Sequence, residues 1–446
     1  MSAVTRKNSM TQGAMLGPII MFALPILLSN FLQQMYNTLD TIVVGRFVGS
    51  VALAAVGSTG SLVNLVIGFF IGLSAGAGVV VSQAYGAGDR ERLSKAVHTG
   101  MAISLVSAVV IGIIGVLFAR TFLGWMGTPD DVIGPATEYL QILFGFAIFM
   151  TIYNMGSGIL RAIGDSKRPL IYLAVCALFN VVLNLLFVCV FHMGVAGVGW
   201  ATIIAQAVSA ALVLLRLMKT KEAYRLELRK IRFHKDVLLE IIRIGIPAGI
   251  QSTVVALSNV IIQGYINSFG SVFMAAFAAA GKIDAFIYMP ISALALTATT
   301  FTGQNIGAGQ IDRVKKGMKL LVCLVAVITF SMGAAIGVFA KFFICLVNTE
   351  AEVVAYGIMI MRILAPLYFI LSIPEVLSGV VRGAGVSMPP MIISLVNMCL
   401  LRVAWLSVMV PLMGDPVSVP LCYPFTWICY CVTFLVYIKK AHWLKH

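Results

Sequence analysis

The property of this sequence that most limits its fold is a series of twelve apolar stretches. Each has about 20 residues or more, which as a helix is enough to cross the hydrocarbon core of a bilayer. Only 11% of the residues are charged, whereas a soluble domain has about a quarter, and the short alternating pattern of β-barrel strands is absent. We therefore predict an all-α polytopic membrane protein with twelve transmembrane helices, at about 16–38, 51–82, 95–118, 132–154, 168–191, 194–216, 238–264, 272–302, 317–340, 353–376, 388–411 and 418–438.

Lysine and arginine are unevenly distributed over the loops between these stretches. Counted with both termini inside, the inside segments hold 25 of the 31 basic residues, and the outside loops hold only Arg46, Arg120 and Lys341. Basic residues gather in cytoplasmic loops, so we predict two cytoplasmic termini and an even number of spans. The net charge of +14 then reflects topology, and we expect membrane lipid rather than nucleic acid as a partner.

The sequence offers no sign of a metal, a cofactor or a catalytic site. The eight cysteines lie in or at the ends of apolar stretches without a C-x-x-C pair. The five histidines lie at span ends, in loops or in the tail, without metal-binding spacing, and we expect them to be surface residues. No H-E-x-x-H pattern falls within a span, and no G-x-x-x-x-G-K-[ST] loop is present. We therefore expect no enzyme, and an ion gradient as the energy source.

The two halves of the chain repeat one another at an offset of 221–222 residues. The aligned positions are 82–88 with 303–309, Arg92 with Arg313, 157–164 with 378–385, and Pro25 with Pro247. Each half holds six spans, and an even number gives both repeats the same orientation, as in secondary transporters that work by alternating access. The longest hydrophilic stretch separates the halves. We predict an N-lobe at 1–216, a cytoplasmic linker at 217–240 and a C-lobe at 241–446.

Three acidic residues fall within spans: Asp40, Asp284 and Glu375. Each needs a partner, water or a function there. Asp40 shares one face of helix 1 with Gln33, Tyr36 and Asn37, because the spacing is i, i+3, i+4, i+7. Lipid would penalise such a polar face, so we expect it to look into the N-lobe. A buried acid there can exchange a proton or bind sodium; the alternative is a solvated structural acid at the end of the helix.

Further polar residues within spans are candidates for lining a substrate cavity. Gln251 and Asn259 lie on helix 7. Lys282 and Asp284 lie on helix 8, and their i, i+2 spacing keeps them off a common face, so each needs another partner or a place in the cavity. The alternative for these two charged residues is a buried structural ion pair.

Glu375 is the third intramembrane acid and follows Pro374 in helix 10. A proline can break a helix, and a break here would leave room for a cavity. Glu375 is therefore a candidate carboxylate for an ion or a substrate. The alternative is a structural pairing with Arg362 or Arg382.

Three motifs give the chain a family resemblance. The element Gln-x-x-Gly-Ala-Gly follows spans 2 and 8, Leu160-Arg161-x-x-Gly164-Asp165 follows span 4, and Asp40 precedes Val44-Gly45-Arg46. Together they resemble the MATE family (multidrug and toxic compound extrusion), closest to the bacterial branch that includes the DinF-like proteins. The resemblance covers essentially the whole chain. It implies a proton- or sodium-coupled antiporter that exports organic cations across the bacterial inner membrane, and we expect a monomer.

The resemblance also implies residue roles. Asp40 corresponds to the acid that couples transport to the cation, and Asn180, Asn184 and Thr202 would lie around it. Relatives often carry Asn-x-x-x-Asp where this chain has Asn180 and Asn184, so the second acid is missing. The alternative for these polar residues is hydrogen bonding between helices.

Within the same superfamily, a flippase for lipid-linked or other metabolite cargo is the alternative function. Twelve spans and three intramembrane acids argue against it. The Gly-Ala-Gly runs at 86–88 and 307–309 lack the strand and the lysine of a phosphate-binding loop, and we expect tight turns between helix ends.

Overall fold

The structure is a computed structural model that describes residues 10–441, 443 and 444. It confirms the all-α membrane fold, because the described residues form helices and no strand. Eleven helices are long and apolar enough to span a membrane, and a twelfth span is added when a bent pair of helices counts as one. These twelve segments coincide with the twelve apolar stretches predicted above.

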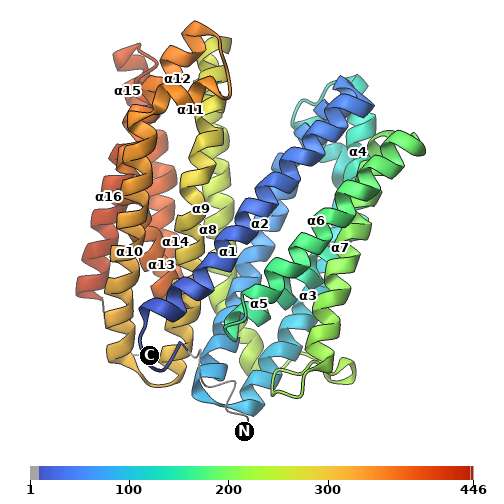
Figure 1. The fold of residues 1–446 in the computed structure, drawn as a ribbon, viewed down its shortest axis with the longest axis vertical. Helices are drawn as coiled ribbons and strands as arrows, with labels where there is room; N and C mark the ends of the chain where they lie inside the picture. The colour runs from blue at the N-terminus through green and yellow to red at the C-terminus, as the bar shows by residue number, and fades with distance from the viewer. Residues whose placement is uncertain (1–9, 442, 445–446) are drawn as a thin grey trace. The chain divides into compact units, whose positions relative to one another are not determined.

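The chain divides into two compact units, each a bundle of helices (Figure 1). The N-unit is Leu24–Gly249, and the C-unit combines the described residues up to Ala23 with those from Ile250 on. The N-unit holds α2 (Ser50–Ala87), α3 (Arg90–Trp125), α4 (Asp130–Gly145), α5 (Ala147–Ala162), α6 (Lys167–Leu185) and α7 (Gly194–Lys219). The C-unit holds α9 (Ser271–Gly307), α10 (Ile311–Val338), α11 (Ala340–Cys345), α12 (Ala351–Leu364), α13 (Tyr368–Gly383), α14 (Met388–Ser394), α15 (Leu401–Met413) and α16 (Ser418–Lys440).

Two helices contribute to both units. These are α1 (Leu16–Val43) and α8 (Lys235–Ser268), which change unit at Ala23/Leu24 and at Gly249/Ile250. The segment predicted as a linker, 217–240, packs within the N-unit. Tyr224 and Leu226 are buried in the N-unit core together with Val237. This stretch is therefore part of the packed unit along much of its length, in addition to connecting the two halves.

The bent span lies in the first half of the chain, where its direction changes by 50° between α4 and α5. Phe146 stands at this bend, and its ring lies 5.1 Å from the ring of Trp200 on α7. The second half has a 3-10 turn at Ala365–Leu367, between α12 and α13, at the equivalent place in the repeat. The helix break expected at Pro374 was placed wrongly. It occurs at Ala365–Leu367 instead, and α13 runs through Pro374 without interruption.

The two Gly-Ala-Gly runs form the predicted tight turns. Gly88 and Gly309 have φ values of 70° and 69°, in the left-handed region that favours glycine. Gly88 ends α2, and the next residue, Asp89, caps α3 by accepting a hydrogen bond of 2.9 Å from the backbone N–H of Arg92. The turn thus sets the direction in which α3 leaves α2.

Glycines on α2 bring this helix into backbone contact with the start of α8. A Cβ atom on Gly76 would lie 2.6 Å from the backbone N of Gly245, and one on Gly72 would lie 2.2 Å from that of Gly249. Residues 72–76 read Gly-Leu-Ser-Ala-Gly, a match to the G-x-S-x-G pattern of hydrolases that the sequence analysis missed. That motif requires a strand-to-helix turn, whereas this run lies inside α2 and its glycines serve close packing.

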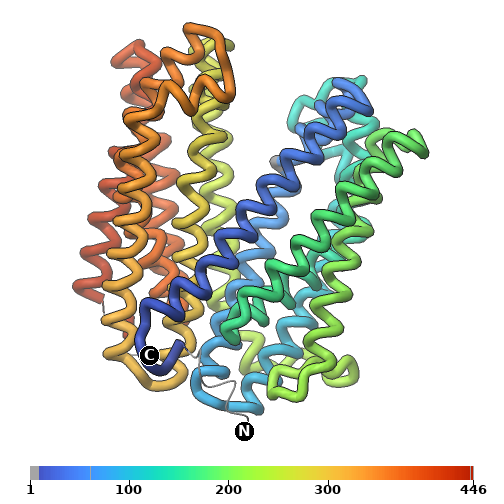
Figure 2. Tube along the Cα trace, in the orientation of Figure 1, coloured from blue at the N-terminus to red at the C-terminus, as the bar shows by residue number. Residues whose placement is uncertain are grey.

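The first described residues of the chain are held by the C-unit. Arg313, at the start of α10, donates hydrogen bonds to the carbonyl oxygens of Met10, Gln12 and Gly13, at 3.1, 3.3 and 2.8 Å. Asn305 on α9 donates a further one to Met10 O. Figure 2 shows this N-terminal segment, in dark blue, beside the turn between α9 and α10.

Candidate functional site

A buried polar network in the N-unit links three helices around Asp40. Asn184 Nδ2 on α6 donates to Asp40 Oδ1 on α1 at 2.6 Å and to Asn180 Oδ1 at 2.8 Å. Asn180 Nδ2 in turn donates to Thr202 Oγ1 on α7 at 3.2 Å. Asn180 and Asn184 are 0% and 1% exposed, so these groups depend on each other for hydrogen bonds. The structure thus brings together the four residues proposed for cation coupling.

Tyr36 is a further neighbour of this network. It lies one turn before Asp40 on α1 and interacts electrostatically with it. Tyr139 on α4 is a buried neighbour that interacts electrostatically with Asp40. The sequence analysis missed Tyr139, since nothing in the spacing of α4 connects it to α1. Within the described chain, Asn184 Oδ1 is the buried atom of this network that has no hydrogen-bond partner.

The predicted polar face of helix 1 is divided in the structure. Tyr36 and Asp40 are half-buried and turn toward α6 and α7, whereas Gln33 and Asn37 are exposed. Gln33 Nε2 donates to Asn37 Oδ1 at 3.4 Å. The expectation that the whole face looks into the lobe was therefore wrong for Gln33 and Asn37, because residues at i, i+3, i+4 and i+7 still spread over part of the helix circumference.

Short π-helical turns follow the network residues on two helices. One, Val44–Val48, continues α1 immediately after the turn that holds Asp40. The other, Leu186–Val190, continues α6 two residues after Asn184. A π-helical turn adds a residue to the helix and changes which side chains face inward, and such turns are frequent at functional sites. Here they end the polar faces of both helices.

In the C-unit, Glu375 lies within a second group of polar residues. It interacts electrostatically with Arg382, one of the two arginines predicted as structural partners, and with Tyr430. Arg382 donates to Gln251 Oε1 on α8 at 3.0 Å. Tyr288 on α9 adds a further hydroxyl group, and its charge interactions reach both Glu375 and Arg382. Glu375 therefore has a cation in its surroundings within the C-unit, although no ion pair within 4 Å joins the two among the described residues.

Asp284 is in a different environment from Glu375. It is half-buried on α9, and its Oδ1 is buried without a hydrogen-bond partner in the described part of the chain. Lys282 is exposed, and neither residue has an ion-pair partner within 4 Å among the described residues. Asn259 is also exposed, on α8. The structure therefore does not bring Asn259 and Lys282 to the buried groups around Asp284 and Glu375.

Arg402 is a buried cation that the sequence analysis counted but did not single out. It is 2% exposed on α15, its guanidinium lies 4.7 Å from the centre of the Tyr423 ring, and no carboxylate is paired with it in the described chain. Asp284 interacts with the same Tyr423. An arginine inside a span is expensive enough to have marked Arg402 as a candidate from the sequence.

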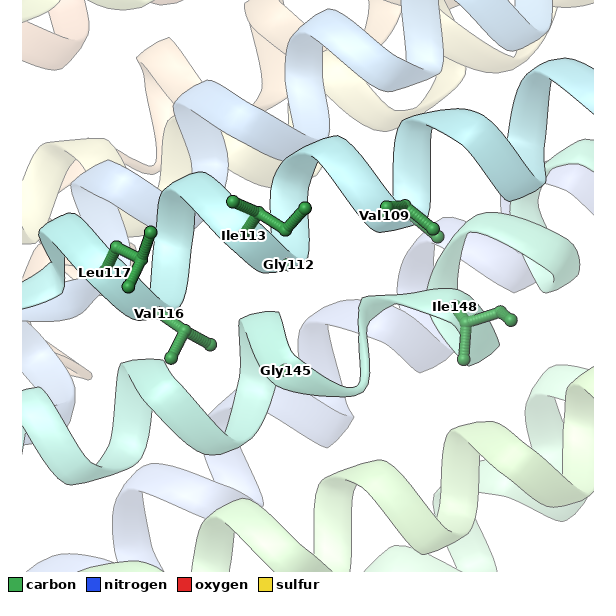
Figure 3. A pocket seen from close by; sticks show the side chains of 8 residues that line it. Val109, Gly112, Ile113, Val116, Leu117, Gly145 and Ile148 are labelled. Carbon is green, nitrogen blue, oxygen red and sulfur yellow. The ribbon is translucent and has the colours of Figure 1, made fainter.

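An apolar groove on the N-unit lies apart from these polar groups. It has a volume of about 540 Å³ and is lined by α3 and by the bend between α4 and α5 (Figure 3). Val109, Ile113 and Leu117 point toward it, and Gly112 and Gly145 widen it. Its lining is aliphatic throughout, so it offers no group that would bind a cation.

Comparison with known proteins agrees with this architecture. The MatE family matches twice, at residues 25–186 and 247–406, which reproduces the duplication. The chain is 30% identical over 392 residues to "Probable multidrug resistance protein YpnP" of Bacillus subtilis, covering 88% of both proteins. It is 21% identical to "Multidrug export protein MepA" of Staphylococcus aureus, over 82% of this chain and 80% of that protein.

Solved structures share the fold. The structure titled "Crystal structure of MATE in the bent conformation" superposes with a TM-score of 0.91 at 22% identity, covering 100% of this chain and 99% of the other. The placement in the DinF-like branch stays a prediction. The double family match and the relative at 30% identity together establish that this chain is an integral membrane transporter of the MATE multidrug efflux family.

Proposed function

We propose that the chain is a secondary antiporter that exports small organic cations in exchange for protons, with Asp40 as the coupling acid. The observation that carries the proposal is the chain of hydrogen bonds that runs from Asp40 through Asn184 and Asn180 to Thr202. It holds one acid among neutral partners. A single proton is therefore enough to change the charge of the site.

This chain of hydrogen bonds can run in either of two directions. With Asp40 ionised, Asn184 donates to the carboxylate and to Asn180, as observed. With Asp40 protonated, its O–H becomes a donor, and half-turn rotations of the two amides offer Asn184 Oδ1 to Asp40 and Asn180 Oδ1 to the hydroxyl of Thr202. These two arrangements differ by one proton and by the direction of the hydrogen bonds. Such a bistable element is what coupling to a conformational cycle requires.

The charge of the site supports a proton rather than sodium. The second carboxylate that relatives often supply at this position is absent, so the site has one formal negative charge.

In the C-unit, we propose Asp284 rather than Glu375 as the acid that recognises the substrate. An organic cation needs a carboxylate whose charge is not already compensated. Glu375 interacts with Arg382, whereas Asp284 Oδ1 has no partner in the described chain. The proposed arrangement therefore separates the coupling acid in one half of the chain from the substrate acid in the other.

The remaining parts of the proposal concern location and organisation. We place the transporter in the bacterial inner membrane as a monomer. The lysine and arginine bias supports a cytoplasmic position for both termini. The N-lobe (1–216) and C-lobe (241–446) would alternate access between the two sides of the membrane.

Dye transport into inverted membrane vesicles tests this function. An imposed pH gradient, acid inside, should drive ethidium uptake by the wild type, and a sodium gradient should not. Asp40→Asn should reduce the proton-driven uptake by at least about tenfold, because the network loses its only carboxylic acid. Asp131→Asn, which removes an exposed acid, is the matched control.

Three results of this experiment would each contradict a part of the proposed function. Undiminished uptake in Asp40→Asn would disprove the coupling role. Sodium-driven uptake by the wild type would replace the proton as the coupling ion. No uptake of any cationic dye under either gradient would overturn drug export and favour lipid-linked or other metabolite cargo.

A further inference from the structure

The predicted linker is fixed to the side of α3 by two histidines. His98 on α3 accepts a hydrogen bond at Nε2 from the backbone N–H of Glu227, at 3.0 Å. The next residue of α3, Thr99, makes two contacts through its Oγ1. This atom lies 3.1 Å from His234 Nδ1, and it accepts a hydrogen bond of 3.2 Å from the backbone N–H of His234. Both histidines were expected at the surface. His98 is instead 2% exposed, because residues 224–234 cover it.

The protonation state of His98 follows from its partners. Its Nδ1 lies 2.7 Å from the carbonyl oxygen of Ser94, which can only accept, so Nδ1 carries a hydrogen. Its Nε2 faces the backbone N–H of Glu227, which can only donate, so Nε2 has its lone pair free. His98 is therefore neutral when the linker is docked. A second proton, on Nε2, would place an N–H group of His98 against the backbone N–H of Glu227.

His234 is fixed in the same tautomer by an independent set of contacts. Its Nε2 lies 3.2 Å from Nε of Arg232, and an arginine N–H can only donate. Its Nδ1–H then donates to Thr99 Oγ1, and the Thr99 hydroxyl is left to donate to the carbonyl oxygen of Arg232, at 3.5 Å. Protonation of His234 would turn its Nε2–H toward the guanidinium of Arg232. Both docking contacts thus require neutral imidazoles.

The charges around His234 mostly oppose its protonation. Burial lowers its pKa most, and Arg232 on the linker and Lys95 and His98 on α3 lower it further, whereas Asp236 at the start of α8 raises it. The net direction is a pKa below the usual value of histidine. The neutral form of such a histidine stabilises the docked linker at pH values above the ordinary pKa of histidine, and this stabilisation is lost as the pH falls.

Acidic groups near His98 are already engaged. Glu227 is the acid that interacts with His98, and its Oε1 is paired with Lys230 at 2.9 Å. Arg225 lies near the same carboxylate. An additional positive charge on His98 would therefore gain little from Glu227, while it would lose the hydrogen bond from the Glu227 N–H.

We propose that residues 224–234 are a pH-operated latch, docked on α3 while His98 and His234 are neutral and released when they bind protons. The docked latch lies directly before α8, whose first turns are tied to the N-unit by the ion pair between Arg92 and Glu240, at 2.7 Å. Release therefore frees the segment that leads into the first helix of the second repeat. The proposal does not depend on which compound is transported.

Hydrogen–deuterium exchange on the full-length protein in detergent tests the latch at about pH 8 and about pH 5.5. After correction for the intrinsic effect of pH, peptides covering 224–234 in the wild type should exchange about tenfold faster or more at the lower pH. Peptides within α6 should not change. Equal protection of 224–234 at both pH values would overturn the proposal.

Substitutions at His98 separate titration from packing. His98→Gln keeps an acceptor near the Nε2 position and cannot titrate in this range, so combined with His234→Gln it should hold 224–234 protected at both pH values. His98→Lys carries a permanent charge and only donors, and should expose the segment even at about pH 8. His192→Gln, at the exposed connection between α6 and α7, is the matched control and should behave as the wild type. A double glutamine variant that responds to pH like the wild type would disprove the role of the two histidines.

Discussion

At the scale of single residues, the chemistry of the N-unit depends on which side chain stands at position 184. Asn184 donates to Asp40 and to Asn180 and so satisfies an ionised carboxylate without carrying a charge. In the other half of the repeat, Ile262 occupies the position equivalent to Asp40 and is 2% exposed. The duplication has thus kept the helix and changed the residue, so the acid is not needed to build the fold.

Asn184→Asp should make stability depend on pH. Two carboxylates in hydrogen-bond contact cannot both ionise cheaply, so this variant should lose about 1–3 kcal/mol relative to the wild type between about pH 6 and pH 9. Thermal unfolding in detergent at the two pH values measures the loss. The double variant Asp40→Asn with Asn184→Asp moves the single acid to α6 and should remove the dependence. A double variant as pH-sensitive as Asn184→Asp would show that pairing of the two acids is not the cause.

At the scale of helices, the contact between α2 and the start of α8 depends on the absence of side chains. Gly76 meets Gly245, and Gly72 meets Gly249, at distances that leave no room for a Cβ atom. Close approach of this kind is how helices associate in a membrane, where no hydrophobic effect drives them together. The contact holds the first half of α8 within the N-unit.

Gly76→Val should separate α2 from α8. Its side chain would meet the backbone of Gly245 and Ile241 at 2.6 Å, and overpacking of this kind costs about 2–3 kcal/mol. We expect a lower melting temperature in detergent and loss of the protection of residues 241–249 from hydrogen exchange. Gly57→Ala, on the same helix with nothing within 4 Å of the added atom, should not be destabilising. Equal stability of the two variants would contradict the packing argument.

At the scale of the whole molecule, the two halves of the duplication hold each other's first helices. Arg92, in the first half, pairs with Glu240 on α8, and its repeat equivalent Arg313, in the second half, binds the carbonyl oxygens of residues 10–13 before α1. The division into compact units follows the same exchange, since α8 begins in the N-unit and the start of α1 belongs to the C-unit. Neither six-helix repeat is therefore a self-contained unit.

Arg313→Ala should release the N-terminal segment. Three hydrogen bonds from a charged donor to carbonyl oxygens would be lost, and at this partly exposed site we expect a loss of about 1–2 kcal/mol. Peptides covering residues 10–16 should exchange hydrogen faster, while those of α16 should not. Lys316→Ala, on the exposed side of the same turn of α10, is the control. Unchanged exchange at 10–16 would mean that Arg313 does not anchor the segment.

Much of the fold was predictable because it is encoded locally or by repetition. Apolar length alone set the twelve spans, since a bilayer leaves the backbone no alternative to a helix. The offset of the repeat predicted the two Gly-Ala-Gly turns, and the family profile matches in both halves at the same offset. Spacing on α1 also predicted a shared polar face around Asp40, although it could not divide the half-buried Tyr36 and Asp40 from the exposed Gln33 and Asn37.

What only the tertiary structure decided are the contacts between residues far apart in the chain. Spacing fixes which side chains share a helix face, but the partner across that face depends on how helices pack, and no local pattern records this. The bond between Asn184 and Asp40 spans 144 residues, and that between His98 and Glu227 spans 129. The sequence by itself thus determined a duplicated twelve-helix transporter with one acid in its first helix. Packing decided which groups surround that acid and that the linker docks on α3.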